Sequence, residues 1–366
     1  MKNPKNLKKK LKYKEIKLSK KYIGKKKFNL NLFFRILIKQ LIIFIFIFLK
    51  NKTYFNQKLS NKLYNNLYED SLRIRQIQND YNHQTFAIMK INCLVCGLFA
   101  FYKHYLGCCS FLLSKGYIPI VDLKSIKNIF NGFNNSSSNK NPYEIFFEQP
   151  YRYELDNVLK KGGKIKYHQC NISSYKFPSY SFFNNNILID YWHNMALKYM
   201  PIKIEIIEEA NIIKNNLFKG SCNILGILAR GTDYLTRKPR LHPVQPKIEN
   251  YFDDINDMNN NYKYDWYFLA TEDVLIRGKL IKKYGKKLKY YKKDENIKYN
   301  YQKKEILCFN NKIKGNIEYV KIYLINIIIL SKCLDIITSR TNGSIAVFFF
   351  SKGFRNSKIY FLGSYK

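Results

Sequence analysis

Arg230 and Asp233 are the two side chains of this sequence with the clearest chemical purpose. They follow an apolar run, ILGILA (224–229), after which the chain turns abruptly polar. Such a run predicts a strand buried in a parallel sheet, and open parallel sheets bind ligands at the carboxyl ends of their strands. An Arg beside an Asp at that place indicates a planar donor fork that grips a phosphate or pyrophosphate.

A second predicted strand, YDWYFLA (264–270), ends in three polar residues, Thr271, Glu272 and Asp273. Their oxygens could accept hydrogen bonds from a ribose or a base. The simpler alternative is that Thr or Asp caps the helix that follows. That helix is expected to close at Gly285.

A third predicted strand, LDIIT (334–338), leads into the loop SRTNG (339–343) and a helix from Ser344 to about Ser351. The hydroxyls, the glycine and the unpaired N–H groups of the helix together suit an anion. The residues concerned are Ser339, Thr341, Asn342, Gly343 and Ser344. An ordinary helix N-cap is the alternative, but a neighbouring Arg230 in the same sheet favours the anion site.

Other phosphate-binding and hydrolytic motifs are missing from the sequence. No Walker A motif, GxGxxG fingerprint, GxSxG elbow or HExxH pair occurs. Phosphate recognition would therefore rest on Arg side chains and helix N-termini.

The chain before residue 219 carries the same alternation of strands and helices. A helix closing at Gly116 precedes a strand, YIPIVD (117–122), and a helical pattern over 192–217 is interrupted by Pro201. Between them, Glu148 and Gln149 follow two Phe residues, a cluster that is unusual for a mere connector, although a capped turn over a hydrophobic patch would also explain it. Such alternation predicts an α/β fold with mostly parallel sheets and helices on both faces.

Three motifs in consistent order resemble those of the α1,6-fucosyltransferase and nodulation fucosyltransferase superfamily. The run ARGTDYLTRKPRLHPVQP (229–246) is similar to its donor-binding motif, FLATED (268–273) to the second, and LSKCLDIITSRTNGS (330–344) to the third. The matching positions of the first motif are Arg230, Thr232, Asp233, His242 and Pro243. Similarity extends upstream to CGLFAFYKHYLG, GYIPIVD and FFEQP, and so covers roughly residues 88–366. The chain departs from the pattern at Leu228, Gly231, Lys238 and Asn326.

This resemblance implies a GT-B-like arrangement of two Rossmann-like domains facing across a cleft. It also implies inverting transfer without a metal or other cofactor, with a nucleotide sugar, GDP-fucose, as donor. Arg230 would grip the pyrophosphate and stabilise the leaving nucleotide, and Asp233 would orient Arg230 or contact the nucleoside. Thr271, Glu272 and Asp273 would lie near the base or ribose, and Thr341 near phosphate. Glu148 and Gln149 would lie on the acceptor side. Asp233, His242 and Glu148 are the candidates for taking the acceptor proton.

The net charge of +38 allows two interpretations. Clustered Lys and Arg are typical of nucleic-acid binding. However, the excess is mostly Lys and accompanies abundant Asn, Ile, Tyr and Phe, which A/T-rich codons specify. We therefore expect that base composition explains most of the charge, and we expect no specific nucleic-acid partner.

The first fifty residues hold sixteen Lys or Arg and one acid, Glu15. The apolar stretch at the end of this segment, 36–49, is too short for a confident transmembrane helix, because a span needs about 20 apolar residues. We interpret it as a helix lying on an anionic membrane surface, attracted by the basic leader. A disordered basic arm followed by a core-packed helix is the alternative.

The eight Cys include a CxxC pair, Cys93 and Cys96, with His104, Cys108 and Cys109 close behind. Adjacent cysteines in an apolar segment suit tetrahedral zinc poorly, so we expect no metal site. Reduced, buried thiols of a cytoplasmic protein are the favoured interpretation.

These observations divide the chain into four parts: a Lys-rich leader with the apolar segment (1–50), a linker or helical region (51–87), an acceptor-side Rossmann-like domain (88–218) and a nucleotide-sugar-binding Rossmann-like domain (219–366). The predicted function is a bacterial glycosyltransferase, peripheral on the cytoplasmic face of the membrane, that builds a surface polysaccharide or glycan on a glycan or lipid-linked acceptor. A nucleic-acid-binding protein and a catalytically inactive sugar-nucleotide-binding relative remain the alternatives.

Overall fold

The computed structural model describes residues 84–91, 96–126, 128, 130, 140–170, 177–296, 299–300, 305–306 and 313–366. All of them belong to one compact unit, Gln78–Lys366. The Lys-rich leader and the apolar stretch 36–49 lie outside the described residues. Among the residues described, no helix combines the length and the hydropathy that a bilayer span requires.

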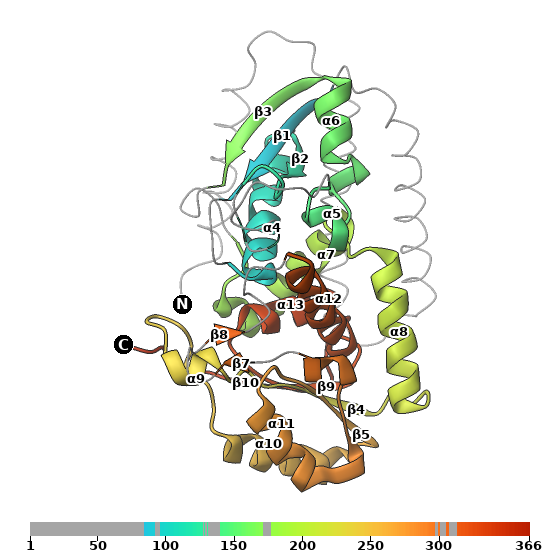
Figure 1. Cartoon of the computed structure of the whole chain (residues 1–366), viewed down its shortest axis with the longest axis vertical. Helices are drawn as coiled ribbons and strands as arrows, with labels where there is room; N and C mark the ends of the chain where they lie inside the picture. The colour runs from blue at the N-terminus through green and yellow to red at the C-terminus, as the bar shows by residue number, and fades with distance from the viewer. Residues whose placement is uncertain are drawn as a thin grey trace, which may run out of the picture. The chain divides into compact units, whose positions relative to one another are not determined.

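The C-terminal half is built on a five-stranded parallel sheet with the order β10-β9-β4-β5-β6 (Figure 1). Its strands are β4 (Ile224–Leu228), β5 (Trp266–Ala270), β6 (Leu288–Lys289), β9 (Asp335–Ser339) and β10 (Ser357–Tyr360). The chain builds outward from β4 through β5 to β6, and then returns to the other side of β4 with β9 and β10. This is the strand order of a Rossmann-like domain, and its direction reverses between β4 and β9.

Helices cover both faces of this sheet because its central strands are apolar on both sides. Alternate residues of β4, Leu225 and Ile227, face a core that contains Tyr251 and Ile255 of α10. The intervening positions, Ile224 and Leu228, face a core shared with α8 and α12. The helices of this half are α9 (Asp233–Arg237), α10 (Ile248–Tyr262), α11 (Val274–Tyr284), α12 (Ile313–Leu330) and α13 (Asn342–Phe350).

The N-terminal half contains a three-stranded parallel sheet with the order β2-β1-β3. Its strands are β1 (Thr85–Lys90), β2 (Ile118–Val121) and β3 (Lys164–Gln169), and its helices include α4 (Leu98–Ser114), α5 (Tyr143–Phe146) and α6 (Leu155–Lys161). β1 begins inside the segment that the sequence assigned to a linker, so the strand order of this half starts three residues before position 88. A parallel α/β architecture is confirmed in both halves.

Two helices connect the sheets, α7 (Asn186–Tyr199) and α8 (Ile204–Phe218). They are separated at Pro201, as the missing N–H of proline predicts. The segment 187–192, whose sequence ILIDYW suits either a strand or the start of a helix, is helical. After α8 the chain turns through Lys219 and Gly220, both at positive φ, which marks the expected joint between the halves.

Short elements complete the described chain. They are η2 (Pro150–Arg152), η4 (Tyr180–Asn184), η5 (Gly285–Lys287), η6 (Lys292–Asn296) and the antiparallel pair β7 (Tyr299–Asn300) and β8 (Glu305–Ile306).

Both halves share one hydrophobic core around α13. The ring of Tyr102 from α4 lies 5.8 Å from that of Phe349, and the ring of Phe182 lies 6.1 Å from that of Phe348. His193 of α7 hydrogen-bonds the carbonyl oxygen of Phe349 at 2.7 Å. The C-terminal end of α13 is therefore packed against elements of the N-terminal half.

The cysteines depart in one respect from the expectation of reduced thiols. Cys108, Cys109, Cys170 and Cys333 are buried free thiols, and Cys222 is free and exposed. Cys96 is disulfide-bonded, so the expectation is wrong at that position.

Candidate functional site

Arg230 lies at the carboxyl end of β4 and is held there by a carboxylate from the neighbouring strand. Its Nε lies 3.3 Å from Oε1 of Glu272, which follows β5. Both side chains are largely buried, with 20% and 9% of their surfaces exposed. A partly desolvated ion pair of this kind restricts the guanidinium to a narrow range of orientations. The carboxylate that pairs with Arg230 thus comes from the second motif, 42 positions along the chain.

The backbone after Arg230 is hydrogen-bonded to Glu272 and to the next residue, Asp273. Gly231 donates its N–H to Glu272 Oε1 at 3.2 Å, and the Thr232 hydroxyl donates to the same oxygen at 3.0 Å. The N–H of Thr232 donates to Asp273 Oδ2 at 2.8 Å. Thr232 has φ +44° and ψ −112°, a strained conformation for a β-branched residue. These hydrogen bonds stabilise the strained turn.

Asp273 also caps a helix, as the simpler sequence interpretation allowed. Its Oδ1 accepts from the N–H groups of Leu275 and Ile276 at 2.9 and 3.1 Å, at the start of α11. The hydroxyl of Thr271 accepts from the N–H of Asp273 at 3.1 Å. Contact of these side chains with a base or ribose remains a prediction.

The turn between β9 and α13 is likewise organised by its own hydroxyls. Thr341 Oγ1 accepts from the N–H of Ser344 at 3.1 Å, and Ser344 Oγ accepts from the N–H of Thr341 at 3.2 Å. Ser339 donates to Oε1 of Gln245 at 2.5 Å. The three hydroxyls are buried, so the groups of this turn best placed for an anion are the first backbone N–H groups of α13, those of Asn342 and Gly343.

Tyr323 of α12 connects this helix start with Arg230, and no feature of the sequence indicated it. A methyl group placed on Gly343 would lie 2.1 Å from the Tyr323 hydroxyl and 3.5 Å from Cδ2 of Leu228. Burial raises the pKa of Tyr323, and the positive charge of Arg230 opposes that shift. Gly343 is therefore needed for close approach, and Tyr323 brings a neutral hydroxyl to the site.

His242 lies on the loop after α9 and reaches Arg230 through an aromatic ring. The guanidinium of Arg230 lies 5.2 Å from the ring centre of Tyr234, whose ring centre lies 5.4 Å from that of His242. His242 is exposed, which suits a group that exchanges protons. Asp233 begins α9, and its side chain lies outside the described residues, so its predicted role is untested.

The His242–Pro243 loop is fixed by the chain around Tyr365. The N–H of Leu241 donates to Tyr365 O at 2.9 Å, and the N–H of Tyr365 donates to His242 O at 2.9 Å. A further bond joins the N–H of Val244 to Gly363 O at 3.1 Å. Three backbone hydrogen bonds thus hold the His242–Pro243 part of the first motif in place.

Arg340, between β9 and α13, is a second cation at the strand ends that sequence reasoning did not single out. Its Nη2 donates to Gly363 O at 2.7 Å. Its guanidinium lies 5.3 Å from the ring centre of Phe361 and 5.8 Å from that of Tyr180 in the N-terminal half. The position of Arg340 just after a buried strand is the sequence feature that could have indicated it.

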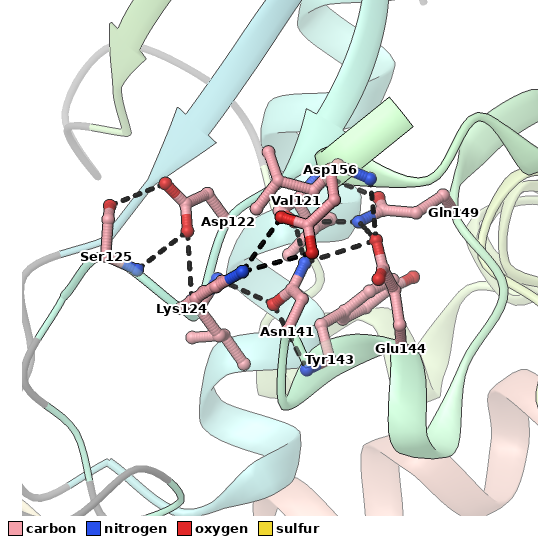
Figure 2. A network of polar contacts seen from close by, with 11 residues as sticks. Val121, Asp122, Lys124, Ser125, Asn141, Tyr143, Glu144, Gln149 and Asp156 are labelled. Atoms are coloured by element: carbon pink, nitrogen blue, oxygen red, sulfur yellow. Dashed lines mark hydrogen bonds and ion pairs between the residues drawn. The ribbon is translucent and has the colours of Figure 1, made fainter. Parts of the chain in front are cut away.

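The structure gives Gln149 a structural role in the N-terminal half (Figure 2). Its Oε1 accepts from the N–H of Val121 at 2.8 Å, and its Nε2 donates to Val121 O and to Glu144 Oε1, each at 2.8 Å. The side chain thereby pairs with the end of edge strand β2 as another strand would. Glu148 forms an ion pair with Arg152, whose Nε lies 2.7 Å from its Oε2. Acceptor contact by either residue stays a prediction.

A small cavity, open to solvent, adjoins the Arg230 pair. Leu228, Tyr319 and Tyr323 form apolar and aromatic walls, and Glu272 lies on the side of Arg230. Asp294 and Asn326 also line the cavity and add polar groups. Apolar, aromatic and polar groups thus meet beside the Arg230–Glu272 pair.

Neither a protein-family model nor a curated protein sequence matches the chain. Solved structures with a similar chain path include fucosyltransferases. The crystal structure of fucosyltransferase NodZ from Bradyrhizobium is 10% identical, with a TM-score of 0.43, over 73% of this chain and 94% of that chain. POFUT1 in complex with GDP is 8% identical, with a TM-score of 0.44, over 76% and 99%. At this identity, we base the functional proposal on the sequence motifs and the site geometry.

Proposed function

We propose that the chain is a glycosyltransferase that transfers a sugar from a nucleoside diphosphate sugar, with GDP-fucose as the candidate donor. One observation carries the proposal: Arg230, ion-paired with Glu272, stands where the strand order reverses between β4 and β9. The N-terminus of α13 follows β9 at the same edge of the sheet. Ligands of open α/β sheets bind at such a reversal.

The proposed role of Arg230 follows from the negative charge that develops on the leaving diphosphate. When the bond between the sugar and the diphosphate breaks, charge develops on the diphosphate oxygens. The guanidinium of Arg230 and the N–H groups that begin α13 would stabilise that charge in a partly desolvated site. Because Glu272 holds Arg230 in place before the ligand arrives, little reorganisation is needed.

The acceptor hydroxyl must lose its proton as the new bond forms. His242 and Asp233 are the proposed bases, and His242 is connected to Arg230 through the ring of Tyr234. Inverting transfer that uses no metal or cofactor, a glycan or lipid-linked acceptor, and a peripheral position on the cytoplasmic face of a bacterial membrane extend the proposal. These parts rest on the sequence motifs and on the basic leader.

A thermal-shift panel of nucleoside diphosphates and their sugars tests the proposal on the full chain. A ligand at 100 times its Kd should add about 2.7 kcal/mol of stability. Arg230→Ala should abolish that gain, whereas Lys279→Ala, which removes an exposed positive charge from α11, should retain it. If no nucleoside diphosphate stabilises the wild-type protein, the proposal is wrong.

Two further measurements separate the alternatives. Release of GDP from GDP-fucose in the presence of an acceptor distinguishes an enzyme from an inactive binding protein. Steeply salt-dependent binding of single-stranded nucleic acid that is unchanged in Arg230→Ala would instead favour a nucleic-acid-binding protein.

A further inference from the structure

Lys103 of α4 lies against two aromatic rings of the segment that follows β3. Its Nζ lies 5.4 Å from the ring centre of Phe177 and 5.7 Å from that of Tyr180. Within the described part of the chain, Lys103 forms no ion pair, and no carboxylate acts on its pKa. The positive charge of this half-buried ammonium is therefore not neutralised by any residue that the structure describes.

Arg340 reaches the same tyrosine from the C-terminal half. Its guanidinium lies 5.8 Å from the ring centre of Tyr180. Its Nη2 donates to Gly363 O at 2.7 Å, whereas its Nε is buried and has no hydrogen-bond partner among the described residues. A buried N–H without an acceptor costs free energy, so a ligand that supplies an acceptor there gains affinity.

These two cations lie on the side of the site that carries the proposed base. Gly363 O, which accepts from Arg340, also accepts at 3.1 Å from the N–H of Val244, in the loop that carries His242. Tyr234, whose ring centre lies 5.4 Å from that of His242, also acts on the pKa of Tyr180. Neither cation lines the small cavity that adjoins the site. An acceptor whose proton passes to His242 would bind on this side.

We propose that Lys103 and Arg340 bind a phosphate group of the acceptor, so that the acceptor is a phosphorylated carbohydrate. This inference rests on the proposed glycosyltransferase function and names the chemical class of its second substrate. A phosphate carries nearly two negative charges and three acceptor oxygens, which matches an ammonium together with a guanidinium whose Nε lacks an acceptor. A carboxylate carries one charge and two oxygens, and matches the two cations less well.

The charge of Lys103 makes this recognition dependent on pH. Burial lowers the pKa of Lys103 to about 8, so the ammonium is present at pH 7 and largely lost at pH 9. Burial and the charge of Lys103 lower the pKa of His104 to about 4, and burial raises that of Tyr180 above its ordinary value. Both groups are therefore neutral from pH 7 to pH 9, and Arg340 stays charged. Since a phosphate monoester keeps its charge over this range, its affinity should fall about tenfold.

The test uses the full chain saturated with GDP, so that the proposed donor site is filled. Calorimetry at pH 7 gives the Kd values of N-acetylglucosamine 1-phosphate, glucuronic acid and uncharged N-acetylglucosamine. We expect the phosphorylated sugar to bind at least tenfold more tightly than the other two, and this preference to shrink about tenfold at pH 9. Lys103→Met should abolish the preference, and Arg340→Met should reduce it.

Two comparisons separate this site from the general positive charge and from the donor site. Lys279→Met, which removes an exposed charge from α11, should keep the preference. Lys103→Met should leave the Kd for GDP unchanged, and a tenfold loss of GDP affinity would assign Lys103 to the donor and overturn the inference.

A wild type loaded with GDP that does not prefer the phosphorylated sugar would also overturn it, and that measurement needs no variant to fold. An unchanged preference in a folded Lys103→Met would do the same. In these cases GDP still binds, whereas a wild type that binds no nucleoside diphosphate overturns the proposed function itself, and this inference with it.

Discussion

Gly231 lies so close to Asp273 that no side chain can be added to it. A methyl group on Gly231 would lie 2.2 Å from Asp273 Oδ2 and 2.6 Å from its Cβ. The contact is tight because Asp273 Oδ2 accepts the N–H of Thr232 in the next peptide unit. Position 231 is one at which the chain departs from the family's first motif. The Asp273 side chain occupies the space that a residue larger than glycine would need there.

We expect Gly231→Ala to lower the free energy of unfolding by about 2–3 kcal/mol, since Asp273 cannot move without losing its helix cap. It should also weaken nucleotide binding, because Arg230 is the preceding residue. Gly278→Ala, on the exposed face of α11 with open space around it, should instead stabilise the protein by about 0.5–1 kcal/mol. Urea unfolding of both variants checks the contrast. Equal effects would contradict the packing at Gly231.

Glu272 should matter both for stability and for binding, because one of its oxygens serves three groups. Glu272→Ala leaves the Arg230 guanidinium, the Gly231 N–H and the Thr232 hydroxyl without that acceptor, and should cost about 3–5 kcal/mol. Glu272→Gln keeps an acceptor but loses the charge, so its loss of stability should be smaller. Both should weaken GDP binding by tenfold or more in calorimetry. A Glu272→Gln protein with wild-type affinity would show that the ion pair does not orient Arg230.

The carboxyl group of Asp294 should make folding less favourable at high pH. Its pKa is about 7 in the folded chain and ordinarily 3.8. Between these values the unfolded chain has released the proton and the folded chain has kept it, so stability falls as the pH rises from about 4 to about 7. Asp294→Asn removes this dependence and should be more stable than the wild type at pH 8, by on the order of 2–4 kcal/mol.

The difference between these two proteins should shrink toward pH 4, where Asp294 is protonated in both states. Urea unfolding at pH 4, 6 and 8 measures it, and Asp257→Asn controls for the change in net charge. A difference that stays constant from pH 4 to pH 8 would mean that Asp294 does not titrate as described.

Tyr323→Phe should affect the ligand more than the fold. The hydroxyl lies against Gly343 and near Arg230, where it can donate to a diphosphate oxygen. We expect about a tenfold weaker affinity for GDP with little change in stability. Tyr102→Phe is the matched control: it removes a buried hydroxyl that donates to Met200 O at 2.7 Å, and should cost stability without altering GDP affinity. The reverse pattern would exclude Tyr323 from the site.

Gln149→Leu should destabilise the N-terminal half by about 1–3 kcal/mol, since it removes the acceptor of the Val121 N–H at a buried strand end, whereas the Val121 carbonyl still accepts from Asn141 Nδ2 at 2.7 Å. Thermal unfolding followed by circular dichroism checks this. If Gln149 served only to contact the acceptor, stability would be unchanged and only the KM for the acceptor would rise.

The sequence was sufficient to predict β4, β5 and β9 because each of them combines an apolar run with an abrupt polar ending. Leu225 and Ile227 are buried on one face and Ile224 on the other, which leaves no polar position to blur the pattern. β3 was missed because it is an edge strand with exposed residues such as Lys166 and Tyr167, so it lacks that pattern. Strand ends were thus predictable, and exposed edges were not.

The candidate site was predictable only in part for the same reason. Arg230, Glu272 and Asp273 follow strands, and parallel strands bring their carboxyl ends together. Tyr323 and Asp294 come from a helix and a connecting segment whose approach to the sheet depends on tertiary packing. Local sequence also cannot show that the Thr341 and Ser344 hydroxyls satisfy each other's backbone N–H groups rather than a ligand.

The hydrogen bonds between the His242–Pro243 loop and Tyr365 set the order in which the site can be completed during synthesis. Strands β4 and β5 emerge from the ribosome together with Arg230 and Glu272 and can pair early. The loop that carries His242 must wait for about 120 more residues before its backbone partners exist. A nascent chain would therefore form the Arg230–Glu272 pair first and position His242 last, so that translation itself delays assembly of the complete site.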